Sequence, residues 1–137
     1  MPDLYYTIIY TLSDNTTVRI MMIDTQLHCD RLGSTRPYPY FAPQSAADDQ
    51  VNWLKGELDK SDEFDWNFVV GHYQIHTPSS PFGNCMNEID EILQTYDVTA
   101  YINGHYHYVS HLESVDKPGF HYITSGWANH GCSRIQC

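Results

Sequence analysis

Histidines follow a glycine at two places where an apolar segment of the chain ends. Residues 66–70 run into a glycine and His72, and residues 98–103 run into a glycine, His105 and His107. Imidazole nitrogens are common ligands of transition metals, and alternate residues of an extended segment project to the same side. The residue types and their spacing therefore predict a metal site built from His72, His105 and His107.

The segments that carry these histidines are typical of a strand–helix–strand unit. Each is an apolar, β-branched or aromatic run of strand length, and between them Met86–Tyr96 places Ile89, Leu93 and Tyr96 at roughly helical spacing. A crossover helix makes the two strands parallel, so both histidine turns should lie at the same carboxyl edge of the sheet. Ligands of open α/β folds bind at that edge.

The remaining segments complete an α/β arrangement with a mixed sheet. The pattern predicts a hairpin with a polar turn, a helix with one apolar stripe and a final strand. The intervening proline-rich segment is expected to be loop. The ranges are Tyr5–Leu12 and Val18–Ile23 for the hairpin, Asp24–Pro43 for the loop, Ser45–Lys60 for the helix and Phe120–Thr124 for the last strand.

Composition and charge exclude several classes of partner. The 137 residues suit one modest domain, and 42% of them are hydrophobic. A net charge of −10 argues against nucleic acid and against anionic membrane surfaces. No apolar run approaches the ~20 residues of a membrane span, and the first residues lack the basic and apolar regions of a signal peptide.

The four cysteines raise two interpretations, a thiolate zinc site or disulfides. They are Cys29, Cys85, Cys132 and Cys137, and none has Cys-X-X-Cys spacing, so a thiolate zinc site is not expected. Disulfides would place the chain in an oxidising compartment. The sequon at Asn15 agrees with secretion but indicates little alone.

Several motifs resemble those of a known family. FVVGHY at 68–73, VTAYINGHYH at 98–107 and HYITSG at 121–126 are similar, in order and spacing, to calcineurin-like metallophosphoesterases, and most similar to the small, tartrate-resistant type of purple acid phosphatase. The resemblance implies a two-sheet α/β sandwich with a dinuclear metal centre. It covers residues 1–137 as the carboxyl-terminal part of one such domain, whose amino-terminal half is expected to be missing.

The resemblance also implies roles for individual residues. His72 and His105 correspond to ligands of the divalent metal (Fe2+, Zn2+ or Mn2+), and His107 to a ligand of the Fe3+ ion. It further suggests that Cys29 pairs with Cys85. An extracellular or lysosomal location and a glycan at Asn15 follow from the same likeness, while Cys132 and Cys137 find no counterpart.

Departures from the family pattern limit what this chain alone is expected to do. The motifs that supply the bridging aspartate, the tyrosinate and the asparagine ligand are absent. Three neutral imidazoles hold two hard cations poorly. Gln74 stands where the family usually has proline, a change expected to loosen the turn. His76 is the nearest candidate for the histidine that contacts substrate, with a surface role as the alternative.

The expected function is that of a piece of an acid phosphatase. The complete enzyme would hydrolyse phosphate monoesters with a metal-activated hydroxide. The isolated chain is expected to be inactive, with the amino-terminal half of the domain as its partner. The alternatives are a non-catalytic or degenerate relative, or another hydrolase of the superfamily such as a nucleotidase or phosphodiesterase.

Overall fold

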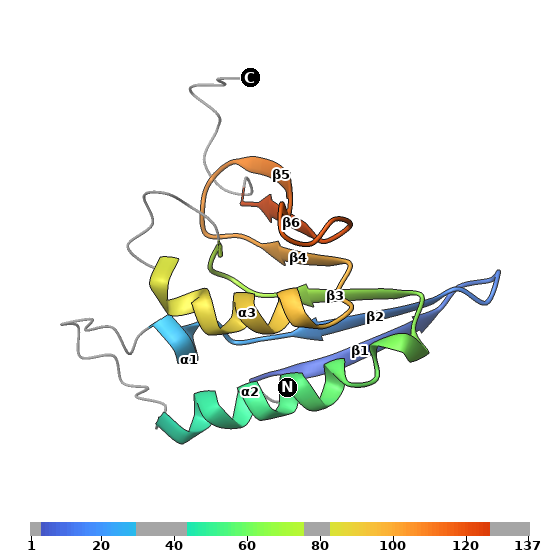
Figure 1. Ribbon diagram of the computed structural model, residues 1–137, viewed down its shortest axis with the longest axis horizontal. Coiled ribbons are helices and arrows are strands. Elements are labelled where there is room, and N and C mark those ends of the chain that lie inside the picture. The colour runs from blue at the N-terminus through green and yellow to red at the C-terminus, as the bar shows by residue number, and fades with distance from the viewer. Residues whose placement is uncertain (1–3, 30–43, 76–82, 127–137) are drawn as a thin grey trace.

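The computed structural model describes residues 4–29, 44–75 and 83–126, which form one six-stranded mixed sheet with helices (Figure 1). The strand order is β1-β2-β3-β4-β6-β5. The strands are β1 (Tyr6–Thr11), β2 (Thr17–Met22), β3 (Trp66–Val70), β4 (Ala100–Asn103), β5 (Val109–Glu113) and β6 (His121–Ser125). The helices are α1 (Gln26–Cys29), α2 (Gln44–Leu58) and α3 (Asn87–Thr95), with short 3-10 helices η2 (Ser61–Glu63) and η3 (Gly83–Met86).

The sheet has a parallel centre and antiparallel edges. Strands β2, β3, β4 and β6 pair in parallel, whereas β1 and β5 pair antiparallel to β2 and β6. Strands β3 and β4 are consecutive parallel neighbours joined through α3, which confirms the predicted strand–helix–strand unit. The predicted hairpin is also confirmed, and α2 and α3 begin and end within two residues of the expected helices.

One α-helix and one strand were not predicted, nor were the two short 3-10 helices. Helix α1 lies inside the expected loop, and at four residues it is too short to show a helical period. Its turn closes through the carbonyl of Thr25, which accepts hydrogen bonds from the backbone of His28 and Cys29. Strand β5 was missed because Val109–Glu113 is a mostly exposed edge strand without clear alternation.

One face of the sheet carries the hydrophobic core. Register partners across β2, β3, β4 and β6 form a single buried row of Met21, Val69, Tyr101 and Tyr122. The same core cluster contains the apolar stripes of both long helices, which are Val51, Leu54 and Leu58 of α2 and Ile89, Ile92 and Leu93 of α3. Burial of these side chains drives the helices onto this face.

The other face of the sheet is also apolar but is only partly buried. The neighbouring register row consists of Met22, Val70, Ile102 and Ile123. All four side chains are of intermediate exposure, and none belongs to the core cluster of the described residues. A β-sheet with two apolar faces requires a layer on each of them. The described part of the chain provides that layer for one face.

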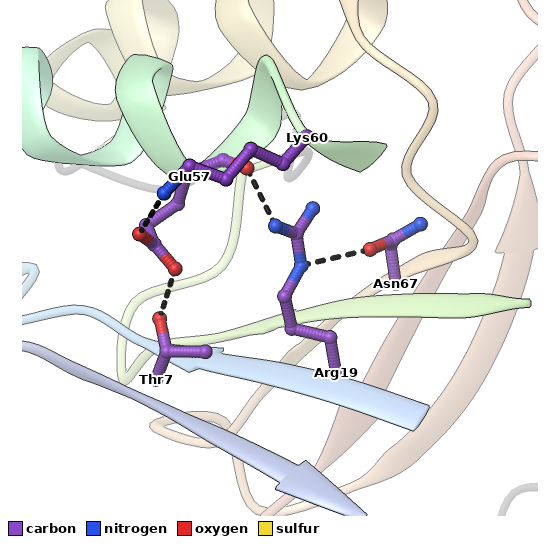
Figure 2. A network of polar contacts seen from close by, with 5 residues as sticks. All are labelled: Thr7, Arg19, Glu57, Lys60 and Asn67. Carbon is purple, nitrogen blue, oxygen red and sulfur yellow. Dashed lines mark hydrogen bonds and ion pairs between the residues drawn. The ribbon is translucent and has the colours of Figure 1, made fainter. Parts of the chain in front are cut away.

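A buried arginine connects the hairpin to the end of α2 (Figure 2). Arg19 is 1% exposed; its Nε donates to Oδ1 of Asn67 at 2.9 Å and its Nη1 donates to the carbonyl oxygen of Glu57 at 2.6 Å. The guanidinium also lies 4.5 Å from the ring centroid of Phe64. Burial lowers the pKa of Arg19, while Glu57 and Glu63 favour its charge. A cation near the last carbonyls of a helix is favourable, so Arg19 stabilises the carboxyl end of α2.

We expect Arg19→Met to lower the free energy of unfolding by about 1–3 kcal/mol, because the buried Oδ1 of Asn67 loses its donor. Lys60→Gln is the matched control. Lys60 belongs to the same network through its 3.3 Å ion pair with Glu57, but it is exposed, so its loss should cost at most about 0.5 kcal/mol. Urea unfolding of both variants checks this prediction, and equal effects would contradict it.

A disulfide joins Cys29 to Cys85, with 4.8 Å between the two Cα atoms. The expected pairing is thus present in the structure. It ties α1 to η3 across 56 positions of sequence and lies at the border of the core cluster.

No helix in the described ranges is long and apolar enough to cross a membrane.

Removal of the disulfide is expected to be costly. Loop-closure entropy for a separation of this size corresponds to about 4 kcal/mol, which in a domain of this length lowers the melting temperature by on the order of 10 °C. Thermal unfolding of the Cys85→Ala variant, with the native chain under non-reducing conditions as the reference, tests this. An unchanged melting temperature would show that the bond does not constrain the unfolded chain.

Candidate metal centre

The two histidine turns lie together at the carboxyl edge of the parallel strands. His72 follows β3 and His105 follows β4, and Nε2 of His72 lies 3.1 Å from Nδ1 of His105. The two ring centroids are 5.0 Å apart and the rings are nearly perpendicular. His107 is exposed two residues further on. The structure therefore brings His72 and His105 into direct contact, with His107 on the same turn as His105.

The turn that carries His72 is held by residues of both neighbouring strands. Oγ1 of Thr25, just after β2, accepts hydrogen bonds from the backbone of His72 and Tyr73 at 3.3 and 3.2 Å. The hydroxyl of Tyr101 donates to the carbonyl of Tyr73 at 2.6 Å, and its burial raises the pKa of that hydroxyl far above its usual range. A Cβ atom on Gly71 would lie 2.6 Å from both Thr25 and Tyr101, so only glycine fits there.

The second turn has an unusual backbone. His105 adopts a positive φ of 62°, a region that non-glycine residues seldom occupy outside constrained sites. Burial lowers the pKa of His105, and the neighbouring His72 and His107 lower it further. Each of these effects favours the neutral imidazole, which is the form that binds metals.

An open hollow of about 490 Å³ lies beside the histidines at the same edge. Its lining is formed by the ends of β2, β3, β4 and β6 and the turns after them: Met22, Ile23, Val70, Gly71, His72, Ile102, Asn103, Gly104 and Ser125. Asn103 is 4% exposed, and both polar atoms of its amide are without a hydrogen-bond partner among the described residues. A buried amide of this kind requires a polar partner, so the hollow is suited to a polar ligand or ordered water.

The donor set fits a metal ion only in part. Two ligand nitrogens at 2.0–2.1 Å from one ion lie roughly 2.9–3.4 Å apart for angles between square-planar and tetrahedral values. The 3.1 Å between His72 and His105 falls within that interval. Within the described ranges, however, no group of three or more His, Cys, Asp or Glu residues is placed to hold a metal. These residues therefore supply a pair of ligands and not a complete dinuclear site.

The sequence of the chain matches the family model for calcineurin-like phosphoesterases over residues 6–109. That segment contains both histidine turns. The chain belongs to the calcineurin-like phosphoesterase family. The likeness inferred from the short motifs is thereby confirmed.

Tartrate-resistant acid phosphatases are among its relatives in this family. The type 5 enzyme of Mus musculus is 32% identical over 136 aligned residues, which cover 93% of this chain and 40% of the mouse protein. The Homo sapiens enzyme is 32% identical over 84% of this chain and 36% of its own length. Purple acid phosphatase 3 of Arabidopsis thaliana is 35% identical over 56% of this chain. The chain thus spans about 40% of the length of its acid phosphatase relatives.

Solved structures support the same fold. GAP50, the anchor in the inner membrane complex of Plasmodium, superposes with a TM-score of 0.65 at 25% identity, over 92% of this chain and 38% of that protein. A dimetal phosphatase from Danio rerio superposes with a TM-score of 0.56 at 17% identity, over 90% of this chain and 49% of the other. The six-stranded sheet with its helices is therefore part of a metallophosphoesterase fold.

Gln74 is a residue whose role the sequence did not predict correctly. Its Nε2 donates to Oγ1 of Thr124 at 3.0 Å, and its Oε1 accepts from the hydroxyl of Tyr108 at 2.9 Å. Gln74 is 4% exposed. The side chain therefore ties the turn after β3 to β6 and to the turn after β4, a role that the sequence did not predict. The sequence feature that could have indicated this role is a glutamine flanked by apolar residues just after a strand.

The other residues singled out from the sequence are placed as follows. Asn15 is exposed in the hairpin turn, where its positive φ of 68° suits an asparagine. His76, Cys132 and Cys137 lie outside the described residues. Thr25, Tyr101 and Asn103 contribute to the site without having been predicted. Asn103 ends β4 and Thr25 follows β2, positions at the carboxyl edge that could have identified them, whereas Tyr101 lies within β4.

The Gln74–Thr124 contact predicts a coupled pair of substitutions. Gln74→Leu should lower the free energy of unfolding by about 1–3 kcal/mol, because the buried Thr124 hydroxyl loses its partner. Thr124→Val should act similarly, and the double variant should be more stable than the sum of the two losses predicts. Urea denaturation of the four proteins gives the coupling energy, and strict additivity would exclude the interaction.

Proposed function

We propose that residues 1–137 form the carboxyl-terminal part of a calcineurin-like acid phosphatase domain, one that hydrolyses phosphate monoesters. The family is established by the matching model, and the named relatives are acid phosphatases. The observation that carries the proposal is the 3.1 Å approach of His72 to His105 at the carboxyl edge of β3 and β4. That edge is where α/β folds bind ligands, and the hollow of about 490 Å³ provides room for a phosphate group.

The proposed roles of the histidines follow the family. His72 and His105 hold the divalent ion of a dinuclear centre, Fe2+, Zn2+ or Mn2+, and His107 binds the Fe3+ ion beside it. Such a centre lowers the pKa of bound water, which makes hydroxide accessible at acidic pH. We propose that the remaining ligands come from the amino-terminal half of the domain; within the described residues, no group of three or more His, Cys, Asp or Glu residues is placed to hold a metal.

The chain itself positions the ligands and shapes the cleft. Thr25 and Tyr101 fix the backbone around His72, so little backbone freedom is lost when the imidazole binds a metal. Gln74 couples the two histidine turns to β6. The unpartnered amide of Asn103 lies where it can bind a polar group of the ligand or a water beside it. His76 remains our candidate for a contact to the substrate phosphate.

The uncovered face of the sheet supports a partner layer for this chain. The row of Met22, Val70, Ile102 and Ile123 is apolar and only partly buried. The acid phosphatase relatives are more than twice as long as this chain. We therefore propose that the amino-terminal half of the same domain packs on this face as the second sheet of the sandwich.

The proposed location is extracellular or lysosomal. Its support is the Cys29–Cys85 disulfide, since such bonds persist in oxidising compartments. The exposed sequon at Asn15 is available for a glycan in the same pathway.

A non-catalytic role is the second candidate, and two observations favour it. The described residues lack a complete metal-ligand group, and the chain superposes on GAP50, the anchor in the inner membrane complex of Plasmodium. In that case the uncovered face would serve assembly and the histidine pair would retain only weak metal binding. Nucleotidase or phosphodiesterase activity is a variant of the first candidate, since it uses the same histidines.

A chimera separates the two candidates. Residues 6–126 would replace the matching segment of the mouse type 5 enzyme, and hydrolysis of p-nitrophenyl phosphate would be measured at acidic pH. We expect turnover by the chimera, a loss of 10²-fold or more on His72→Ala, and negligible turnover by the 137-residue chain alone. Lys55→Gln, on the exposed surface of α2, is the control and should retain full activity.

Two outcomes would contradict the catalytic proposal. One is a folded chimera, with the native disulfide formed, that shows no turnover. The other is a chimera whose turnover survives His72→Ala, since that result would remove this histidine from the centre. Robust turnover by the 137-residue chain alone would refute the need for a partner layer.

A further inference from the structure

A second pair of histidines lies at the edge of the sheet opposite β1. His111 lies on β5 and His121 on β6, the two strands drawn in orange and red in Figure 1. Nε2 of His111 is 3.1 Å from Nδ1 of His121, and the ring centroids are 4.9 Å apart. This is the same nitrogen separation as in the His72–His105 pair.

The strand register explains why these two rings meet. His111 is the partner of Ile123, and His121 lies two residues before Ile123, so both histidines share one face as a diagonal pair. Diagonal neighbours on antiparallel strands are within reach of long or aromatic side chains. His111 is exposed and His121 is partly exposed. This is the face that carries Ile123, which the proposed second layer would cover; in the described residues it is open, both rings are accessible from solvent, and the site below is one of this chain with that face open.

The hairpin that carries the pair is held in place before any ligand arrives. Strands β5 and β6 pair over five residues each, and the backbone of Ser114 donates to the carbonyl of Phe120 at 2.8 Å. Glu113 is the register partner of His121, and one of its carboxylate oxygens accepts from the backbone of Gly119 at 2.8 Å. The pair thus lies beside a fixed negative charge, which favours a cation.

We propose that His111 and His121 form a second metal site, one that binds a single divalent transition ion such as Zn²⁺, Ni²⁺ or Cu²⁺ through two imidazoles. The 3.1 Å separation lies within the roughly 2.9–3.4 Å that two nitrogens span on one such ion. Imidazole suits these metals, whereas Mg²⁺ and Ca²⁺ require oxygen ligands. Water completes the coordination, since the described residues include no third protein ligand in position.

The test is a Zn²⁺ titration of the full chain, followed by NMR of the histidine ring nitrogens. His72→Gln and His105→Gln are introduced first, so that the other pair no longer binds the probe. The resonances of His111 Nε2 and His121 Nδ1 should shift together along one saturation curve. His111→Gln should weaken Zn²⁺ binding at His121 by about tenfold or more, because the second ligand acts at high effective concentration.

The reciprocal variant His121→Gln should weaken binding at His111 to a similar extent. Ser110→Ala, on the other face of β5, is the matched control and should leave the binding curve unchanged. Backbone amide spectra confirm that each variant keeps the β5–β6 pairing. Independent titration of the two rings, or unaltered binding at His121 in the His111→Gln variant, would overturn the proposal.

Discussion

The parallel pairing of β3 with β4 determines where the imidazoles of the candidate site lie. Because α3 returns the chain to the starting edge, both strands end at the same edge, and the residue after each glycine faces the other. His72 and His105 then need no further rearrangement to come within 3.1 Å. The residues around them serve this geometry: Gly71 permits the close approach of Thr25 and Tyr101, and those two side chains hold the turn.

The asymmetry between the two sheet faces links the fold to the proposed function. The row of Met21, Val69, Tyr101 and Tyr122 is sealed by α2 and α3, whereas the adjacent register row on the other face is apolar and only partly buried. The incomplete ligand group and the partly exposed apolar face point to the same conclusion. In our proposal a further layer completes both, and the acid phosphatase relatives are long enough to contain such a layer.

Short-range patterns in the sequence were sufficient to predict the elements whose apolar residues recur at strand or helix spacing. The hairpin, both long helices, the parallel unit and the Cys29–Cys85 pairing were predicted, the last through family resemblance. Features that depend on tertiary contacts were not. The role of Gln74 depends on Thr124, fifty residues away, and strand β5 exists because β6 offers it an edge. The diagonal meeting of His111 and His121 likewise follows from register, which the sequence of either strand alone does not encode.

The central claim is that His72 and His105 bind one metal ion together. It is tested most directly by Zn²⁺ titration of the chain carrying His111→Gln, with NMR detection of the ring nitrogens. The account predicts that His72 Nε2 and His105 Nδ1 lose their free-ring resonances in parallel at one equivalent of Zn²⁺, since these two nitrogens face each other. Binding to one ring alone, or two separate saturation curves, would contradict it.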